Sequence, residues 1–175
     1  MMRILVYGAG VLGCTLARDF FKVGKDVTLL ARGKWAETIK TNGLCIKNYV
    51  LPMKSTVRVP VVTELASEDE YDVIFVAARY TQVATILDAL RANKGKNVVF
   101  LGNNVQPEKL VTALPEKNVM FAFASSAGHR EQDRIVSVDL KKITIGQLRG
   151  VQSNEQLIQK IFARTGYKVT YEPNM

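Results

Sequence analysis

The sequence predicts an α/β domain whose sheet is doubly wound and mostly parallel, with a small antiparallel extension. Three observations lead to this prediction. Apolar runs alternate with amphipathic stretches along the chain, and the glycine-rich run GAGVLG joins the first apolar run to the first amphipathic one. In addition, 47% of the 175 residues are hydrophobic and 23% are charged, which is enough apolar surface for one core. We therefore expect residues 1–175 to form one domain.

The first elements form a strand-turn-helix-strand unit. Residues 3–7 (RILVY) are apolar and predict a buried strand. Leucine, phenylalanine and valine recur at helical spacing over residues 11–23, and Gly24 ends this predicted helix. Residues 26–31 (DVTLLA) predict a second strand, which would lie parallel to the first.

The same criteria predict the later elements. The piece over 44–50 is expected to form a hairpin or an excursion with the next β-rich piece, and the last two β-rich pieces a terminal hairpin. Ser153 with Gln156 predicts a capping box at the start of the last helix. In chain order, we expect helices over 34–41, 81–92, 106–114 and 153–165, strands over 72–78, 97–101, 118–124 and 167–172, and β-rich pieces over 44–50, 55–62, 133–139 and 142–146.

The glycine-rich turn predicts a Rossmann-type dinucleotide-binding domain. Gly8 allows the tight turn, Gly10 leaves room for a pyrophosphate beside the backbone, and Gly13 lets the helix pack closely against the strand. The N–H groups at the start of the helix would then face the phosphates. Besides these glycines, the turn contributes Ala9, Val11 and Leu12 to the predicted cofactor-binding residues.

The end of the second strand predicts which dinucleotide binds. A site for NAD usually has Asp or Glu there to accept hydrogen bonds from the ribose hydroxyls. This sequence has Ala31-Arg32-Gly33 instead, and the nearest acid, Asp26, begins the strand and should lie at the opposite edge. A guanidinium suits a 2′-phosphate, so we expect Arg32 to favour NADP(H). The alternative is a surface arginine at a strand end.

Composition and charge narrow the partners. The formal net charge is +8, but the lysines and arginines are dispersed, which argues against nucleic acid and for a solvated basic surface. No segment has the length of a signal peptide or a membrane helix. Cys14 and Cys45 form no close pair, so a disulfide framework is not expected and a reducing, cytoplasmic location is. The single histidine, His129, excludes a histidine-rich metal cluster.

Several landmarks together resemble the N-terminal domain of ketopantoate reductases. They are GAGVLG, the arginine after the second strand, VIFVAARYTQ, and the Asn103-Asn104 turn, and the resemblance covers residues 2–172. These proteins are NADP-dependent 2-dehydropantoate 2-reductases of the 6-phosphogluconate dehydrogenase-like group. The resemblance implies that Arg79, in place of the usual lysine, lies near a cofactor phosphate. It also implies that Asn103 contacts the nicotinamide ribose and the substrate.

Besides Arg79, the sequence departs from the family pattern at two further places. Asn104 stands where the family has glycine, and we expect the turn to persist because asparagine tolerates a positive φ. The family's glycine-rich stretch after the next strand is replaced by SSAGH, where we expect Ser125 or Ser126 near the nicotinamide. These departures bear most on the identity of the substrate.

The family resemblance also implies a reaction. NADPH would give a hydride to a 2-keto acid, a step of pantothenate biosynthesis. A second, helical domain carries the general-acid lysine in the family, and we expect that lysine beyond residue 175, so that the isolated chain is inactive. The alternative is a non-catalytic module that senses NADP(H). A 2-keto acid is the expected small-molecule partner, nucleic acid and membrane are not expected, and a homodimer is compatible with the sequence.

Four residues have a structural interpretation beside the functional one. Arg79 can be a solvated residue at a strand end, and Asn103 only a turn former. Cys14 can be a low-pKa thiol at a helix start, although a small packing residue is the favoured interpretation. His129 can be an acid catalyst, but no carboxylate lies near it in sequence, so a loop surface position is favoured.

Overall fold

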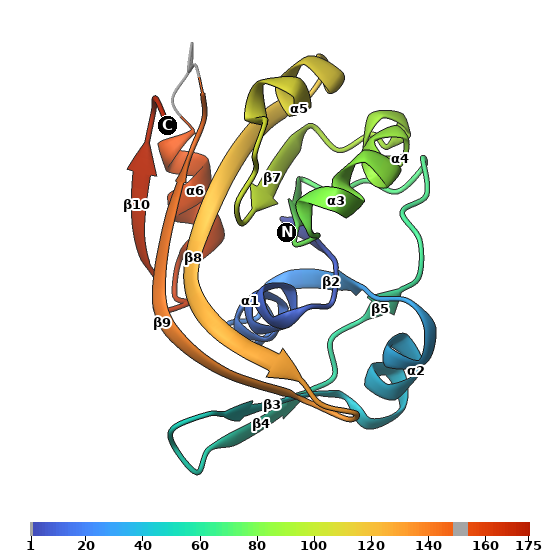
Figure 1. Ribbon diagram of the computed structural model, residues 1–175, viewed down its shortest axis with the longest axis vertical. Coiled ribbons are helices and arrows are strands. Elements are labelled where there is room, and N and C mark those ends of the chain that lie inside the picture. Colours follow the sequence, from blue (N-terminus) through green and yellow to red (C-terminus); the bar gives the residue numbers. More distant parts are fainter. Residues whose placement is uncertain (1, 149–153) are drawn as a thin grey trace.

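The computed structural model describes residues 2–148 and 154–175, which form an α/β domain with one ten-stranded sheet (Figure 1). The strands run in the order β4-β3-β9-β8-β7-β6-β1-β2-β5, and β10 pairs with β9 beside this path. The strands are β1 (Arg3–Tyr7), β2 (Asp26–Leu30), β3 (Leu44–Asn48), β4 (Lys54–Val57), β5 (Val61–Val62), β6 (Val73–Val76), β7 (Asn97–Leu101), β8 (Asn118–Arg130), β9 (Ile135–Gly146) and β10 (Lys168–Glu172). The helices are α1 (Val11–Lys22), α2 (Gly33–Asn42), α3 (Tyr80–Val83), the 3-10 helix η1 (Ala84–Ile86), α4 (Leu87–Ala92), α5 (Pro107–Ala113) and α6 (Glu155–Phe162).

The parallel centre of the sheet places a crevice at the end of β1. β1 lies between β2 and β6 and is parallel to both. The chain passes from β1 to β2 on one side and from β6 to β7 on the other, so these two connections lead in opposite directions along the sheet. Such a reversal of strand order opens a crevice at the carboxyl ends of the strands. The doubly wound, mostly parallel architecture predicted from the sequence is confirmed.

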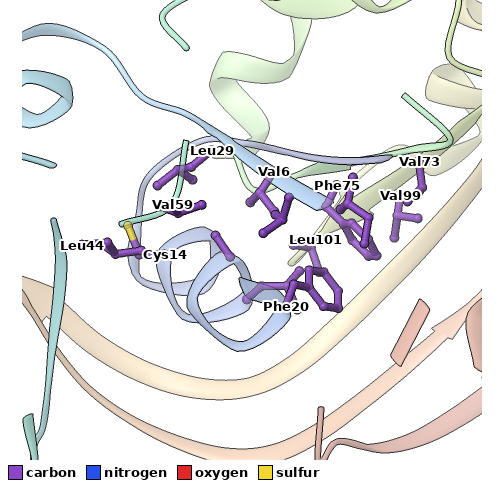
Figure 2. Close-up of a cluster of buried hydrophobic side chains, with 14 of the residues drawn as sticks. Val6, Cys14, Phe20, Leu29, Leu44, Val59, Val73, Phe75, Val99 and Leu101 are labelled. Carbon is purple, nitrogen blue, oxygen red and sulfur yellow. The ribbon is translucent and has the colours of Figure 1, made fainter. Parts of the chain in front are cut away.

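Alternation along the central strands divides the core between the two faces of the sheet. Ile4 and Val6 of β1 belong to one apolar cluster, and Leu5 and Tyr7 to the other. The first cluster lies under α1, α2 and α6, and the second under α3, η1, α4 and α5. Figure 2 shows α1 of the first cluster beneath the sheet, with Phe20 close to the strand residues. Helices on both faces explain why the central strands are apolar throughout.

The antiparallel part is larger than predicted. The prediction of a hairpin between 133–139 and 142–146 was wrong, because residues 135–146 form one strand, β9, whose antiparallel partner is β8. Between the two predicted pieces the strand is irregular: Lys141 has a φ of 53°, and its N–H donates to Asp139 Oδ1 at 2.9 Å. The real turn lies at residues 131–134.

β8 also runs beyond its predicted end at residue 124. Its last pairing with β7 joins Leu101 and Ala122, but pairing with β9 carries β8 on to Arg130. The segment predicted as a loop, SSAGH, is therefore strand, because a strand partner that is distant in sequence completes its hydrogen bonds. This long hairpin curves around α1 toward α2 (Figure 1).

Smaller differences concern element ends. The predicted piece over 55–62 divides into β4, which forms the antiparallel hairpin with β3, and β5, which pairs in parallel with β2. The predicted helix over 81–92 is broken into α3, η1 and α4. The last helix is shorter than predicted and begins after Asn154; Ser153 of the expected capping box lies outside the described residues.

Candidate functional site: a cleft at the glycine turn

A cleft of about 850 Å³ opens at the carboxyl ends of β1, β2, β6 and β7. It lies at the position that the strand order predicts for a ligand. The residues that line it include the glycine turn and most of the predicted site: Gly8, Ala9, Gly10, Val11, Leu12, Leu30, Ala31, Arg32, Trp35, Ala77, Ala78, Arg79, Tyr80, Gln82, Thr85, Ile86, Leu101, Gly102, Asn103 and Arg130.

The three glycines of the turn occupy three different environments. Gly8 has a φ of +112°, and a Cβ there would lie 2.6 Å from the carbonyl oxygen of Ala77. A Cβ on Gly13 would lie 1.9 Å from the carbonyl oxygen of Gly8, so this glycine is needed for close packing of α1. A Cβ on Gly10 would meet nothing within 4 Å, because Gly10 faces the open cleft. The turn thus leaves space where a pyrophosphate would approach the start of α1.

Trp35 of α2 contacts this turn. Its indole Nε1 donates to the carbonyl oxygen of Ala9 at 2.9 Å, while its side chain stays almost fully buried. This contact joins α2 to the turn across the cleft floor. The sequence does not predict this contact, because a side chain's partner in another segment cannot be read from the helix that carries it.

Cys14 is a packing residue. It is fully buried, and Figure 2 shows it near Leu44 and Val59. Burial raises the pKa of its thiol to about 12, although Trp35 and Arg130 act in the opposite direction. The alternative of a low-pKa thiol at the helix start was therefore wrong, because desolvation outweighs the favourable end of the helix.

Arg32 stands at the end of β2 and is the residue before α2. Its guanidinium donates to the hydroxyl of Tyr7 and lies 5.6 Å from the centre of that ring. Asp26 is at the other end of β2, as expected. There its carboxylate lies 4.0 Å from Nε of Arg3. Within the described part of the chain, the cleft lining contains no Asp or Glu. This end of the cleft is therefore cationic.

Arg79 follows β6 and precedes α3. Its backbone N–H donates to Gln82 Oε1 at 3.4 Å, which helps to hold the start of this short helix, and its exposed side chain lines the cleft. Gln82 and Tyr80 line the same wall. Gln82 was not predicted from the sequence, although a glutamine three residues after the residue that precedes a helix is typical of a capping box.

Asn103 lies in the turn after β7 and lines the cleft. The positive φ of this turn belongs to Gly102, at +98°, so the expectation that Asn104 would adopt it was wrong. The glycine immediately before Asn103 supplies the required freedom, and the side chain of Asn104 donates to the carbonyl oxygen of Gly102 at 3.0 Å.

The SSAGH segment lies apart from the cleft lining. Neither Ser125 nor Ser126 is among the lining residues, and the enclosed Ser126 Oγ has no hydrogen-bond partner among the described residues. His129 is exposed on β8 and does not line the cleft either. Its Nε2 lies 3.7 Å from Glu131, so the expectation that no carboxylate is near it was wrong.

Residues 2–148 and 154–175 contain neither a candidate metal site nor a candidate membrane-spanning helix. No group of three or more His, Cys, Asp or Glu side chains could hold a metal ion. No helix in these ranges is long and apolar enough to span a bilayer.

The sheet order, the glycine turn and the cleft define an α/β domain of the Rossmann type. A sequence profile described as "Ketopantoate reductase PanE/ApbA" matches residues 4–150, which is most of the chain. The chain belongs to the ketopantoate reductase family, whose members are pyridine-nucleotide-dependent oxidoreductases. The family predicted from the sequence is thereby confirmed.

Individual relatives agree with this assignment. A 2-dehydropantoate 2-reductase of Pyrococcus abyssi is 25% identical over 164 residues, which is 91% of this chain and 52% of that protein. An enzyme of the same name from Pyrococcus horikoshii is 37% identical over 62 residues, 34% of this chain and 21% of its own. The chain thus spans about half the length of the Pyrococcus abyssi enzyme.

Solved structures share the fold. The 2-dehydropantoate 2-reductase of Geobacter metallireducens superposes with a TM-score of 0.84 at 20% identity, covering 98% of this chain and 58% of that one. The enzyme from Methylococcus capsulatus gives 0.80 at 23% identity, with 99% and 57% covered. A D-mandelate dehydrogenase solved with NADH and anilino(oxo)acetate gives 0.79 at 18% identity, with 98% and 57% covered.

Proposed function

We propose that this chain binds NADP(H) in the cleft and forms the nucleotide-binding part of a 2-dehydropantoate 2-reductase-like oxidoreductase. In that protein a hydride would pass from NADPH to the carbonyl carbon of a small 2-keto acid. The observation that carries the proposal is the combination of open space at Gly10 with a cation, and no carboxylate, at the end of β2. The enzyme names of the Pyrococcus relatives support the substrate class.

The residues of the turn fit a pyrophosphate. Backbone N–H groups at the start of α1 have no side-chain cap, since the residue before the helix is Gly10. They are therefore free to donate to phosphate oxygens, and the helix dipole favours negative charge there. Gly8 and Gly13 keep the turn and the helix in place. Ala9, Val11 and Leu12 line the cleft beside them, around the space for the pyrophosphate.

The residue after β2 would decide between NADP and NAD. A neighbour with the same fold was solved with NADH, so the fold alone leaves this choice open. Arg32 faces the cleft at the position where a carboxylate would bind ribose hydroxyls. Its forked donors match a 2′-phosphate, and a carboxylate would instead repel that group.

At the opposite wall, Arg79 and Asn103 would orient the rest of the cofactor and the substrate. Arg79 supplies positive charge beside α3, and Asn103 supplies an amide that can both donate and accept hydrogen bonds. We no longer include Ser125 and Ser126 in the proposal, because neither lines the cleft.

When bound, NADPH supplies the hydride, and the protein must stabilise the negative charge that develops on the substrate oxygen. Among the described residues, the cleft lining contains no Lys, His, Asp or Glu, and the hydroxyl of its tyrosine, Tyr80, donates to Gln106 Oε1 at 3.4 Å. We therefore propose that the general acid, a lysine by resemblance to the family, lies outside residues 1–175.

Cys14 and Cys45 are free buried thiols, which suits the proposed cytoplasmic location.

Calorimetric titration of the protein with NADPH and NADH tests the proposal. We expect tighter binding of NADPH, because only NADPH carries the 2′-phosphate that Arg32 would contact. Equal affinity for the two cofactors, or a preference for NADH, would contradict the assignment to NADP(H).

The lack of an acid in the cleft lining also favours a second candidate, a module that binds NADP(H) without catalysis. Cofactor binding is common to both candidates and does not separate them. The coding sequence after residue 175 separates them, since a reductase requires a helical domain with the general-acid lysine and a sensor does not.

A further inference from the structure

The end of the cleft near Arg32 gathers further positive charge from a distant part of the chain. Arg130 is the last residue of β8 and pairs with Ile135 across the hairpin turn. β8 continues beyond its pairing with β7 and curves toward α2 (Figure 1). Arg130, at its end, therefore lines the cleft that the turn and β2 form.

Arg130 is seated on the residue that supports the glycine turn. Its guanidinium carbon lies 5.5 Å from the centre of the Trp35 ring, and the same indole donates to the carbonyl oxygen of Ala9. A recess of about 430 Å³ opens beside this pair and is lined by Lys34, Trp35, Thr38, Arg130, Glu131 and Gln132. Trp35 and Arg130 line both the cleft and the recess, so the two spaces meet at these side chains.

The charges at this corner are not balanced. Within residues 2–148 and 154–175, none of Arg32, Lys34 and Arg130 has a carboxylate within ion-pair distance. Glu131, the acid of the recess, is engaged within the hairpin instead, where its carboxylate lies 3.2 Å from Arg134. A corner with three cations and no paired acid favours a dianionic ligand group.

We propose that Arg130 is a specificity-determining residue that, with Arg32 and Lys34, contacts the 2′-phosphate of NADP(H). This inference rests on the proposed function and adds a residue from the β8–β9 hairpin to the cofactor site. Trp35 would hold the guanidinium by a cation–π contact and so fix its direction toward the phosphate. The hairpin would then select the phosphorylated dinucleotide, while the glycine turn binds the part that both dinucleotides share.

Binding of four ligands to the whole chain tests this inference: NADPH, NADH, 2′,5′-ADP and 5′-ADP. In Arg130→Ala we expect affinity for NADPH and 2′,5′-ADP to fall about tenfold, because one charge-assisted contact is lost. Affinity for NADH and 5′-ADP should stay within about twofold. Arg130→Lys should retain part of the NADPH affinity, since it keeps the charge without the fork.

Arg58→Ala is the matched control. It removes the same charge from an exposed arginine that lines neither the cleft nor the recess. We expect this variant to bind all four ligands as the unmodified protein does. An equal loss for NADPH and NADH in Arg130→Ala, or no loss for either, would overturn the inference.

The unmodified protein separates failure of the inference from failure of the proposed function. If it does not prefer NADPH over NADH, the assignment to NADP(H) fails and the inference fails with it. If it prefers NADPH, and Arg32→Ala lowers this preference while Arg130→Ala does not, only the role of Arg130 is overturned.

Discussion

At the scale of single residues, Arg32 and Cys14 show two ways in which the surroundings decide what a side chain does. Arg32 stands at the cleft, where its charge can be used on a ligand. Cys14 lies in the first turn of α1, yet it is fully buried against the sheet. Position along the chain places both near the glycine turn, but only one of them is accessible from the cleft.

Replacing Arg32 with Asp should reverse the cofactor preference. The change removes a charge-assisted contact to the 2′-phosphate and introduces an acceptor for ribose hydroxyls, as in NAD sites. We expect a loss on the order of 1–3 kcal/mol in the binding free energy of NADPH, measured by calorimetry. Arg58→Asp, which changes the charge equally at an exposed position that does not line the cleft, is the control. A preference for NADPH retained by Arg32→Asp would contradict the prediction.

The thiol of Cys14 should not react in the folded protein. With Cys45 replaced by Ala, alkylation of Cys14 at pH 7 to 9 (about the range in which an exposed thiol becomes reactive) should be very slow, and fast once the protein is unfolded in guanidinium. Burial raises the folded-state pKa from 9.0 to about 12. The protonated thiol therefore contributes stability below about pH 9, and this contribution is lost as the pH rises toward 12. Rapid alkylation of the native protein would contradict the buried position.

At the scale of elements, the glycine turn combines two functions in one short segment. Gly10 faces open space, whereas Gly13 is in contact with the backbone of the turn. The sequence motif predicts both roles, because each glycine occupies a fixed position between a strand and a helix. The structure distinguishes them physically, so that two substitutions can separate binding from folding.

Gly10→Val should abolish cofactor binding and leave the fold intact. Its Cβ would meet no protein atom within 4 Å, and its backbone is extended, which valine tolerates. The branched side chain would instead occupy the space for the pyrophosphate. Circular dichroism and cofactor titration on the same sample measure both properties. Cofactor binding at unchanged affinity would show that this glycine has only a structural role.

Gly13→Ala should have the opposite pattern in stability. Its Cβ would lie 1.9 Å from the carbonyl oxygen of Gly8, so α1 would have to move away from the strand. We expect the free energy of unfolding to fall by about 1–3 kcal/mol, the usual cost of overpacking. Chemical denaturation of this variant beside Gly10→Val measures the difference, and equal stability of the two variants would contradict it.

The β8–β9 hairpin is the element that the sequence predicted least well. The sequence predicted a hairpin between the pieces over 133–139 and 142–146, and a strand that ends before SSAGH. In the structure both regions are strand, because β9 supplies the hydrogen bonds that β8 lacks beyond β7. Pairing between segments distant in sequence overrides local propensity, and a bulge resembles a turn when only the sequence is read.

At the scale of the whole molecule, the strand order brings residues from four βα connections into one cleft. Gly10, Arg32, Arg79 and Asn103 follow β1, β2, β6 and β7 in turn, and all line it. Gly10 and Arg32 were predicted from the ends of the first two strands, and Arg79 and Asn103 from the resemblance to the family. The contribution of Arg130 was not, because it comes from an antiparallel extension that curves back across the domain.

The chain by itself should not reduce 2-ketopantoate or pyruvate at a useful rate, although we expect it to bind NADPH. The cleft lining offers no proton donor such as Lys, His, Asp or Glu among the described residues, and the barrier for charge development on the carbonyl oxygen would stay high. Loss of reduced-nicotinamide absorbance measures turnover. A rate near that of typical enzymes, roughly 10 per second, would contradict the prediction and require a donor within this chain.

The sequence by itself determined the fold class, the family, the glycine turn and the strand-end residues of the cleft, because these depend on local periodicity and on motifs with fixed spacing. Only the tertiary structure decided the extent of the β8–β9 hairpin, the position of the positive φ at Gly102, the burial of Cys14 and the place of Arg130 on Trp35. These features depend on which distant segments pair and pack against one another, and no local pattern in the sequence records that choice.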